Sequence, residues 1–108
     1  MLIVSHRLFL KTEAGDRVIE ISIHKPEPAT ASWSCRYEID WPEGRQVRDA
    51  CGTDALQALV LALQMIGADI YTSAYHREGR LRAYDTDKGY GFPVPSSLRN
   101  LLVGVDAI

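Results

Sequence analysis

Apolar and polar residues alternate with a period of two in four stretches of the first half of the chain, a pattern typical of half-buried β-strands. The stretches are 3–12, 17–24, 33–41 and, more weakly, 45–51. Residues rich in glycine, proline and acidic side chains separate them, so we predict an antiparallel meander of four strands. The clearest alternation is in 33–41, whose apolar face holds Trp33, Cys35, Tyr37, Ile39 and Trp41.

The registers of the two hairpins follow from matching apolar residues across neighbouring strands. In the first hairpin, pairing Thr12 with Arg17 places Leu8 opposite Ile21. Glu13–Asp16 then form the turn, with Gly15 free to adopt positive φ.

In the second hairpin, pairing Trp41 with Arg45 matches apolar residues in the same way and sets Cys35 opposite Cys51. A shift by one residue would turn the apolar face of 33–41 towards polar residues such as Gln46. We therefore prefer the first register, which brings the two cysteines side by side.

Residues 54–75 contain no proline and many good helix formers, and they predict one long helix across the sheet. Asp54 is a good N-cap, and Gln57 can reach back towards it as in a capping box. Leu61 and Met65 lie off the main apolar stripe and form a second apolar edge that needs a cover. The stripe itself consists of Leu56, Leu59, Val60, Leu63, Ile66 and Ile70.

The last third of the chain completes a single α+β domain that spans 1–108. We divide it into a meander (1–51), the helix (54–75) and a C-terminal part (79–108) with a short fifth strand at 80–84, a loop and a tail. Either this tail or another subunit covers the second apolar edge of the helix. The apolar residues of the tail that could do so are Leu98, Leu101, Leu102, Val103 and Val105.

Composition and charge exclude several classes of protein. The 108 residues are 46% hydrophobic and 24% charged, with a net charge of −2, as in an ordinary globular domain and unlike a disordered chain. Lysine and arginine are dispersed among acidic residues, which argues against nucleic-acid binding. The first residues do not form a signal peptide, and no stretch approaches the ~20 apolar residues of a membrane span. We therefore expect a cytoplasmic protein with no membrane contact.

Three segments, in this order, resemble a family of small bacterial proteins of unknown function. They are the strand Trp33-Ser34-Cys35-Arg36-Tyr37, the start of the helix from Gly52 to Leu63, and the closing Gly91-Phe92-Pro93. One departure is Ala83-Tyr84 after Leu81, where the family is associated with Leu-x-Trp. The resemblance implies a small bacterial cytoplasmic protein and brings no activity or binding residue.

No candidate catalytic residue, metal ligand or cofactor site stands out. Cys35 and Cys51 could form a redox pair or bind a metal, but both fall on the predicted core face, where cysteine acts as a small hydrophobe. The three histidines, His6, His24 and His76, lack the spacing of a metal site. A nucleophile pair between a cysteine and His6 is conceivable, but no motif places the two together.

The segment from Asp85 to Pro95 holds two further candidates. Its acidic start superficially resembles a calcium loop, but the later ligand positions of an EF-hand are not matched. Its glycines and prolines could present Tyr90 and Phe92 to a partner, or Phe92 could close the end of the core.

Two functions from different classes remain. The first is a non-enzymatic protein-interaction or regulatory domain, either a homodimer or the partner of another protein, with Leu61, Met65, Tyr90 and Phe92 as candidate interface residues. The second is a small-molecule binder or minor enzyme with a pocket between the sheet and the loop 84–92. The absence of a catalytic constellation and the second apolar edge of the helix favour the first.

Overall fold

Four long strands pair in sequence order as an antiparallel meander, in a computed structural model that describes residues 1–83 and 89–93. β1 (Leu2–Thr12) pairs with β2 (Gly15–His24), β2 with β4 (Trp33–Trp41), and β4 with β5 (Gly44–Gly52). Two short strands extend this sheet. β3 (Glu27–Pro28) pairs with β4, and β6 (Leu81–Arg82) pairs with β1 where the fifth strand was predicted. The predicted α+β fold is confirmed.

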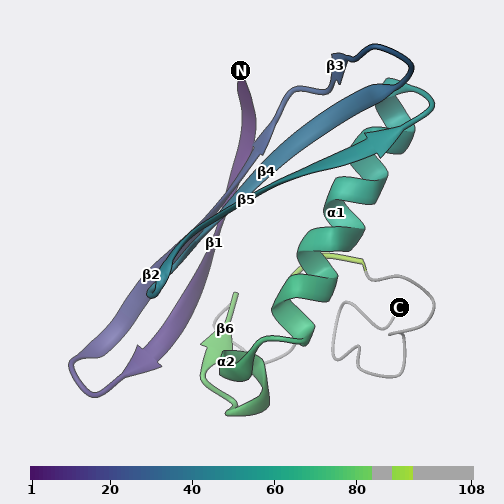
Figure 1. The fold of residues 1–108 in the computed structure, drawn as a ribbon. Helices are drawn as coiled ribbons and strands as arrows, with labels where there is room; N and C mark the ends of the chain where they lie inside the picture. The colour runs from purple at the N-terminus through teal and green to yellow at the C-terminus, as the bar shows by residue number, and fades with distance from the viewer. Residues whose placement is uncertain (84–88, 94–108) are drawn as a thin grey trace.

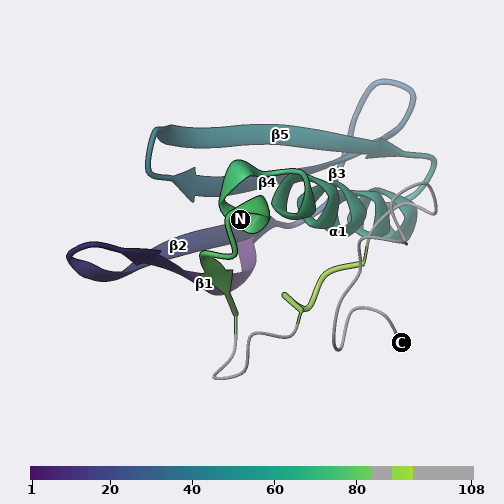
Figure 2. The same ribbon diagram turned by 90° about the horizontal axis from the view of Figure 1, so that it is seen from below.

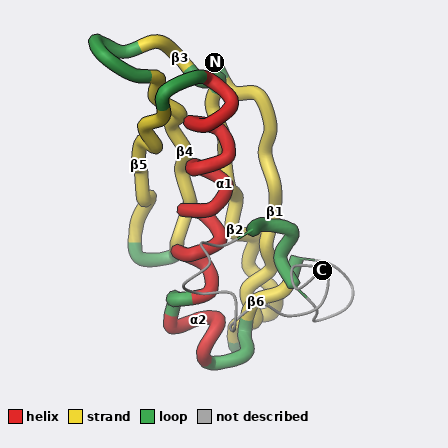
Figure 3. Tube along the Cα trace, turned by 90° about the vertical axis from the view of Figure 1, so that its right-hand side faces the viewer, coloured by secondary structure: helices red, strands yellow, loops and turns green. Residues whose placement is uncertain are grey.

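One helix, α1 (Ala55–Tyr71), lies along one face of the twisted sheet (Figure 1). Seen from below, α1 lies under β4 and β5, while the hairpin of β1 and β2 extends away from it (Figure 2). Turned to the side, α1 runs in front of the sheet between β5 and β1 (Figure 3). The described residues therefore form two layers, with the core between them.

The N-terminus of α1 begins as the sequence predicts. The side chain of Asp54 accepts a hydrogen bond from the backbone N–H of Gln57 at 2.8 Å. The side chain of Gln57 in turn accepts from the backbone N–H and the hydroxyl of Thr53. These bonds satisfy N–H groups at the start of the helix that have no partner within it.

The C-terminus of α1 comes earlier than predicted, at Tyr71 instead of residue 75. The hydroxyl of Ser73 donates to the carbonyl oxygen of Ile70 and accepts from the N–H of His76. Ser73 thereby caps the short helix α2 (Ala74–Arg77), which turns the chain towards β6.

The face of α1 that packs on the sheet contains only part of the predicted stripe, with Ile66 and Ile70 buried as expected. Small residues, Ala58 and Ala62, are fully buried, whereas Leu56 and Val60 are 70% and 40% exposed. Bulky side chains of the sheet already fill the space between the layers, and Gly52 brings the backbone of β5 against Ala58. This close approach requires small helix residues at the contact. Ile66, Gly67, Ile70 and Tyr71 complete the buried face.

The first hairpin pairs two residues away from the predicted register. Thr12 lies opposite Gly15, so Leu8 faces Ile19 instead of Ile21. Gly15 adopts φ +110° and already pairs with Thr12, so the turn consists of Glu13 and Ala14 alone. A shift of two preserves the faces of both strands, so the predicted core residues stay in the core.

The second hairpin pairs one residue away from the predicted register, and this changes the face of every residue in β5. Trp41 lies opposite Gly44, which has φ +148°, and Cys35 lies opposite Ala50. Val47 and Cys51 therefore point to the outer face of the sheet. The prediction that Cys35 and Cys51 lie side by side is wrong.

Gln46 and Arg48 accordingly lie on the face that carries the helix. Sequence reasoning rejected this register because it sets polar side chains against the apolar face of β4. The structure satisfies them through Asp69 of α1, as described below.

Candidate interaction surface

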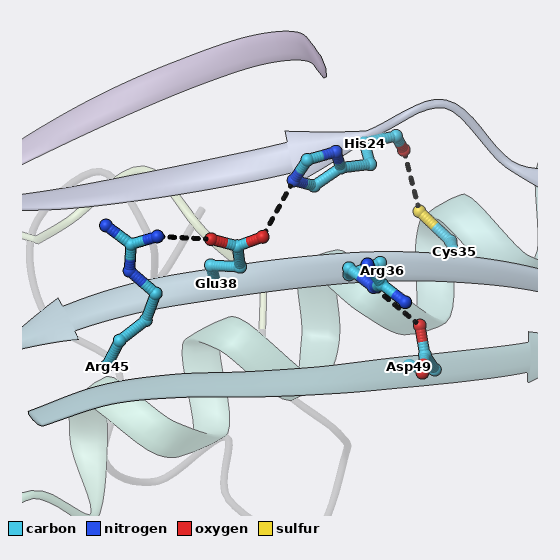
Figure 4. Close-up of polar contacts among 6 residues, drawn as sticks. All are labelled: His24, Cys35, Arg36, Glu38, Arg45 and Asp49. Carbon is cyan, nitrogen blue, oxygen red and sulfur yellow. Dashed lines mark hydrogen bonds and ion pairs between the residues drawn. The ribbon is translucent and has the colours of Figure 1, made fainter. Parts of the chain in front are cut away.

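Charged residues form a connected group on the outer face of the sheet, opposite α1 (Figure 4). The carboxylate of Glu38 on β4 contacts the imidazole of His24 on β2 at 3.1 Å and the guanidinium of Arg45 on β5 at 3.3 Å. Beside it, Arg36 on β4 pairs with Asp49 on β5 at 3.6 Å. Both arginines and Asp49 are about half-exposed, so these ion pairs add little stability.

The outer face of β5 combines these charges with an exposed apolar side chain. Val47 is 51% exposed and lies between Arg45 and Asp49, which share its face at a spacing of two residues. The free thiol of Cys51 follows on the same face and is also exposed. Opposite charges on either side of an apolar centre are suited to a protein partner.

The backbone of β5 adds a row of free hydrogen-bonding groups. β5 pairs with β4 along its whole length, and no other strand of the described part of the chain pairs with it. The closing pair of a two-residue hairpin is hydrogen-bonded, and directly opposite residues alternate between bonded and unbonded pairs. Trp41 and Gly44 close this hairpin, so Arg45, Val47 and Asp49 direct their N–H and C=O groups away from β4.

The hairpin of β1 and β2 shows the same alternation. Thr12 and Gly15 close that hairpin, so Lys11 should point its backbone away from β2. The N–H of Lys11 indeed donates to the carbonyl oxygen of Arg80 at 2.9 Å, outside the β1–β2 pair.

The inner face of β5 is fixed by a network around Asp69 of α1. The Asp69 carboxylate accepts hydrogen bonds from the hydroxyl of Tyr37, from Gln46 at 3.2 Å and from Arg48 at 3.0 Å. Gln46 also accepts from the indole N–H of Trp41 at 2.8 Å. Burial and the bond to Asp69 raise the pKa of Tyr37. The network links the inner face of β5 to the helix.

The two cysteines occupy different environments. Cys35 is fully buried, and its thiol donates to the backbone carbonyl of His24 at 3.4 Å. Burial, with a smaller contribution from Asp49, raises the pKa of the Cys35 thiol, which keeps it protonated and unreactive. The core position predicted for Cys35 is confirmed, whereas Cys51 lies outside the core.

Tyr90 and Phe92, two of the predicted interface residues, are buried in this chain. The hydroxyl of Tyr90 is bonded to Nδ1 of His76 at 2.6 Å, and Nε2 of His6 donates to the Tyr90 carbonyl at 3.0 Å. Phe92 packs edge-on against the ring of His6. Sequence reasoning did not foresee that Tyr90 joins His6 and His76, which are 70 positions apart.

Leu61 and Met65, the other two predicted interface residues, are half-buried and pack against the core. Their role at an interface stays a prediction. The apolar helix residues with the larger exposed fractions are Leu56 and Val60.

A groove of about 670 Å³ lies between the β4–β5 hairpin and α2. Trp41 and Tyr75 stack in it with ring centroids 5.5 Å apart. The hydroxyl of Tyr75 donates to Glu43 at 2.7 Å, and this bond raises the pKa of Tyr75. Asp69 lines the same groove, so an aromatic floor lies beside acidic groups.

Sequence reasoning missed Asp69 and Val47, and a signal existed for the first. Asp69 is the one charged residue of α1, and a single carboxylate in an otherwise apolar helix indicates a polar partner. Val47 gave no such signal, because the weak apolar alternation of β5 is compatible with either face of the strand pointing to the core.

The sequence predicts neither a metal site nor a membrane span. Within 1–83 and 89–93, no three histidine, cysteine or acidic residues are grouped to hold a metal ion, and no helix could span a membrane. The acidic start of the supposed calcium loop, the loop side of the predicted pocket before Gly89, and the tail beyond Pro93 lie outside the described residues.

Residues 4–94 match the model of a family described as a domain of unknown function, DUF6968. The match covers most of the 108 residues, so the chain belongs to this family. No curated protein and no solved structure matches the chain.

Proposed function

We propose that this member of DUF6968 is a non-enzymatic protein-interaction domain that binds its partner along β5. The observation that carries the proposal is the outer edge of this strand, with which no other described strand pairs. Its outward backbone groups at Arg45, Val47 and Asp49 lie next to the side chains of the same three residues. Such an edge can accept a further strand, with backbone hydrogen bonds for affinity and side chains for specificity.

The attachment of β5 to α1 supports this role. Asp69 holds the inner face of the strand through Gln46 and Arg48, so a partner meets an edge that is already extended. A preformed edge loses less conformational entropy on binding than a flexible segment.

The environment of the nucleophiles supports a non-enzymatic role. The thiol of Cys35 is buried, has a raised pKa and donates to a carbonyl instead of facing a base. Cys51 is exposed on the outer face of β5, beside the proposed contact.

A bacterial cytoplasmic setting forms part of the proposal. Its support is the resemblance to small bacterial proteins and the presence of two free thiols, which persist in a reducing compartment.

Photo-crosslinking from single outer-face valines tests the interaction. A photoreactive phenylalanine analogue replaces Val47 in one variant and Val18 in another. Val18 is a matched control, because it is 46% exposed on the same face but lies in the β1–β2 hairpin, opposite Phe9 of β1 and away from β5.

We expect protein adducts from position 47 in extracts of the source cells, and a marked reduction when unmodified chain is added in excess. Adducts from position 18 should stay at background. Equal or absent crosslinking at the two positions would contradict an interaction along β5.

The alternative function, small-molecule binding, is favoured by the groove at Trp41 and Tyr75. Arg80 lies over the ring of Tyr75 there, so the site takes a cation beside the carboxylate of Glu43, and a planar aromatic cation that displaces Arg80 would suit it. Titration with benzylammonium, followed by the fluorescence of Trp41 in a Trp33→Phe background, tests it. A saturable change that Glu43→Gln weakens would support the alternative, and no change would exclude this class of ligand.

A further inference from the structure

We propose that the partner of β5 is a second copy of this chain, paired antiparallel along the same strand with Val47 on the two-fold axis. This inference rests on the proposed function and identifies its partner. It follows from the order of charges along the strand and from the direction of its backbone groups.

The backbone N–H and C=O groups of β5 are oriented to form hydrogen bonds in such a pair. Two-fold pairing about Val47 sets Val47 opposite its own copy and Arg45 opposite Asp49 of the second copy. All three residues direct their N–H and C=O groups away from β4. The three pairs of opposite residues are therefore all hydrogen-bonded pairs.

The side chains are complementary in the same register. Arg45 and Asp49 lie on the outer face, so each arginine of one copy meets an aspartate of the other. The two valines meet at the centre, where half of each side chain is exposed in the single chain. Opposite charges across neighbouring strands are favourable, and an apolar pair adds to them.

Neighbouring registers set like charges opposite each other. An axis on Arg45, Arg48 or Asp49 places that residue opposite its own copy, and an axis on Gln46 places Asp49 opposite Glu43. Like charges directly opposite are destabilising. Among axes on residues 45–49, the charges therefore select the one on Val47, and an axis on Cys51 forms no pair of opposite charges because it sets Asp49 opposite Thr53.

The ion pairs already present in one chain extend across this contact. Glu38 holds Arg45 at 3.3 Å, and Arg36 lies 3.6 Å from Asp49 (Figure 4). Pairing about Val47 joins the two groups into one alternating row, with Arg45 between Glu38 of its own copy and Asp49 of the other. Arg45 and Asp49 each keep their present partner and gain a second.

The opposite edge of the sheet lacks this symmetry. The first half of β1 pairs only with β2 among the described strands, and Leu2, Ile3 and Val4 are about half-exposed there. Two-fold pairing about Ser5 would set Ile3 opposite Arg7, an apolar residue against a charge. β1 therefore carries no charge pattern that identifies a second copy.

Charge exchange at Arg45 and Asp49 tests the inference. Arg45→Glu and Asp49→Lys each set like charges opposite in a dimer of the single variant. An equimolar mixture of the two variants restores opposite charges at both positions. Light scattering with size-exclusion chromatography over a dilution series gives the mass of each sample, and circular dichroism confirms that each variant is folded.

We expect the wild type to approach twice the 12.0 kDa mass of one chain as its concentration rises. Each single variant should dimerise about tenfold or more weakly. The equimolar mixture and the double variant Arg45→Glu/Asp49→Lys should recover most of the wild-type dimer. Recovery in the mixture depends only on a contact between copies and is independent of any loss of stability in each variant.

A wild type that stays at one chain mass at every concentration would overturn the inference. So would single variants that dimerise like the wild type, or a mixture that stays as weak as its components. Such a failure leaves the proposed function intact if position 47 still crosslinks to a different protein. Failure of the crosslinking removes both.

Discussion

The polar residues on the inner face of β5 share one hydrogen-bond acceptor, the carboxylate of Asp69. Tyr37, Gln46 and Arg48 all donate to Asp69, and these bonds make the observed register possible. The sequence predicts that Tyr37 is buried but gives no indication that its hydroxyl needs an acceptor on the helix. A network that spans three elements is visible only once those elements are packed together.

Asp69→Ala should lower the free energy of unfolding by about 1–3 kcal/mol, because the buried hydroxyl of Tyr37 loses its acceptor. Urea denaturation measures the change. Asp40→Ala is the control, since Asp40 is exposed on the outer face and should change stability by less than about 0.5 kcal/mol. Equal effects of the two variants would contradict a stabilising role for the network.

The stability of the fold should fall as the pH decreases below about 6.5, because burial lowers the pKa of His76 from its ordinary value of 6.5. The unfolded chain binds a proton at His76 before the folded chain does, so protons favour unfolding in this range. The loss develops as the pH falls from 6.5 through the lower pKa of the folded state.

His76→Asn removes the titrating group and retains an amide that can donate to or accept from the Tyr90 hydroxyl. Urea denaturation between pH 7.5 and about 5.5 compares the two proteins. The variant should show a flatter dependence of stability on pH than the wild type. Identical slopes would mean that His76 does not contribute.

At the scale of elements, alternation predicts which segments are strands and which residues of the first three long strands are buried. It does not predict register, because the turns decide that. Gly15 and Gly44 close both hairpins with two-residue turns, and the matching of apolar residues cannot show where a turn closes. β5 has few apolar residues, and there the predicted register was wrong by one residue. This error assigned each side chain of β5 to the wrong face of the sheet.

The contact between β5 and α1 should not tolerate a side chain at residue 52. A Cβ on Gly52 would lie 2.5 Å from the backbone nitrogen of Ala58 and 2.9 Å from the carbonyl carbon of Gln57. Backbone atoms cannot move aside without shifting the helix. We expect Gly52→Ala to destabilise the protein by about 1–3 kcal/mol in thermal or urea denaturation.

The control is Gly79→Ala, where nothing lies within 4 Å of the added atom but φ is +69°. Its cost of about 1–2 kcal/mol arises from the backbone alone. At Gly52 the cost arises from contact with helix backbone atoms, so the double variant Gly52→Ala/Ala58→Gly, which removes only a side-chain atom, should not recover stability. A stability of Gly52→Ala equal to the wild type would contradict the close approach.

The two apolar edges of α1 should respond differently to a polar residue. Leu61→Gln should lower stability by about 1–3 kcal/mol because Leu61 packs against the core. Leu56→Gln should change it by less than about 0.5 kcal/mol because Leu56 is largely exposed. The reverse order in urea denaturation would show that Leu56, not Leu61, faces the core.

At the scale of the whole molecule, the sequence predicts the meander, the helix and the short last strand, since each depends on local pattern. It predicts the candidate surface only in part. Alternation along 17–24 and 33–41 places His24, Arg36 and Glu38 on the outer face, as observed, whereas Val47 and Arg48 exchanged faces with the register. An open strand edge is a property of the assembled sheet, so no local pattern reveals it.

Amide hydrogen exchange along β5, followed residue by residue by NMR over a dilution series, tests most directly whether this edge is the contact. The N–H groups of Gln46, Arg48 and Ala50 point to β4 and should exchange slowly at every concentration. Those of Arg45, Val47 and Asp49 should exchange fast in dilute protein and slow down as it is concentrated. Fast exchange of these three at every concentration would contradict pairing between copies, as would slow exchange already in the dilute monomer.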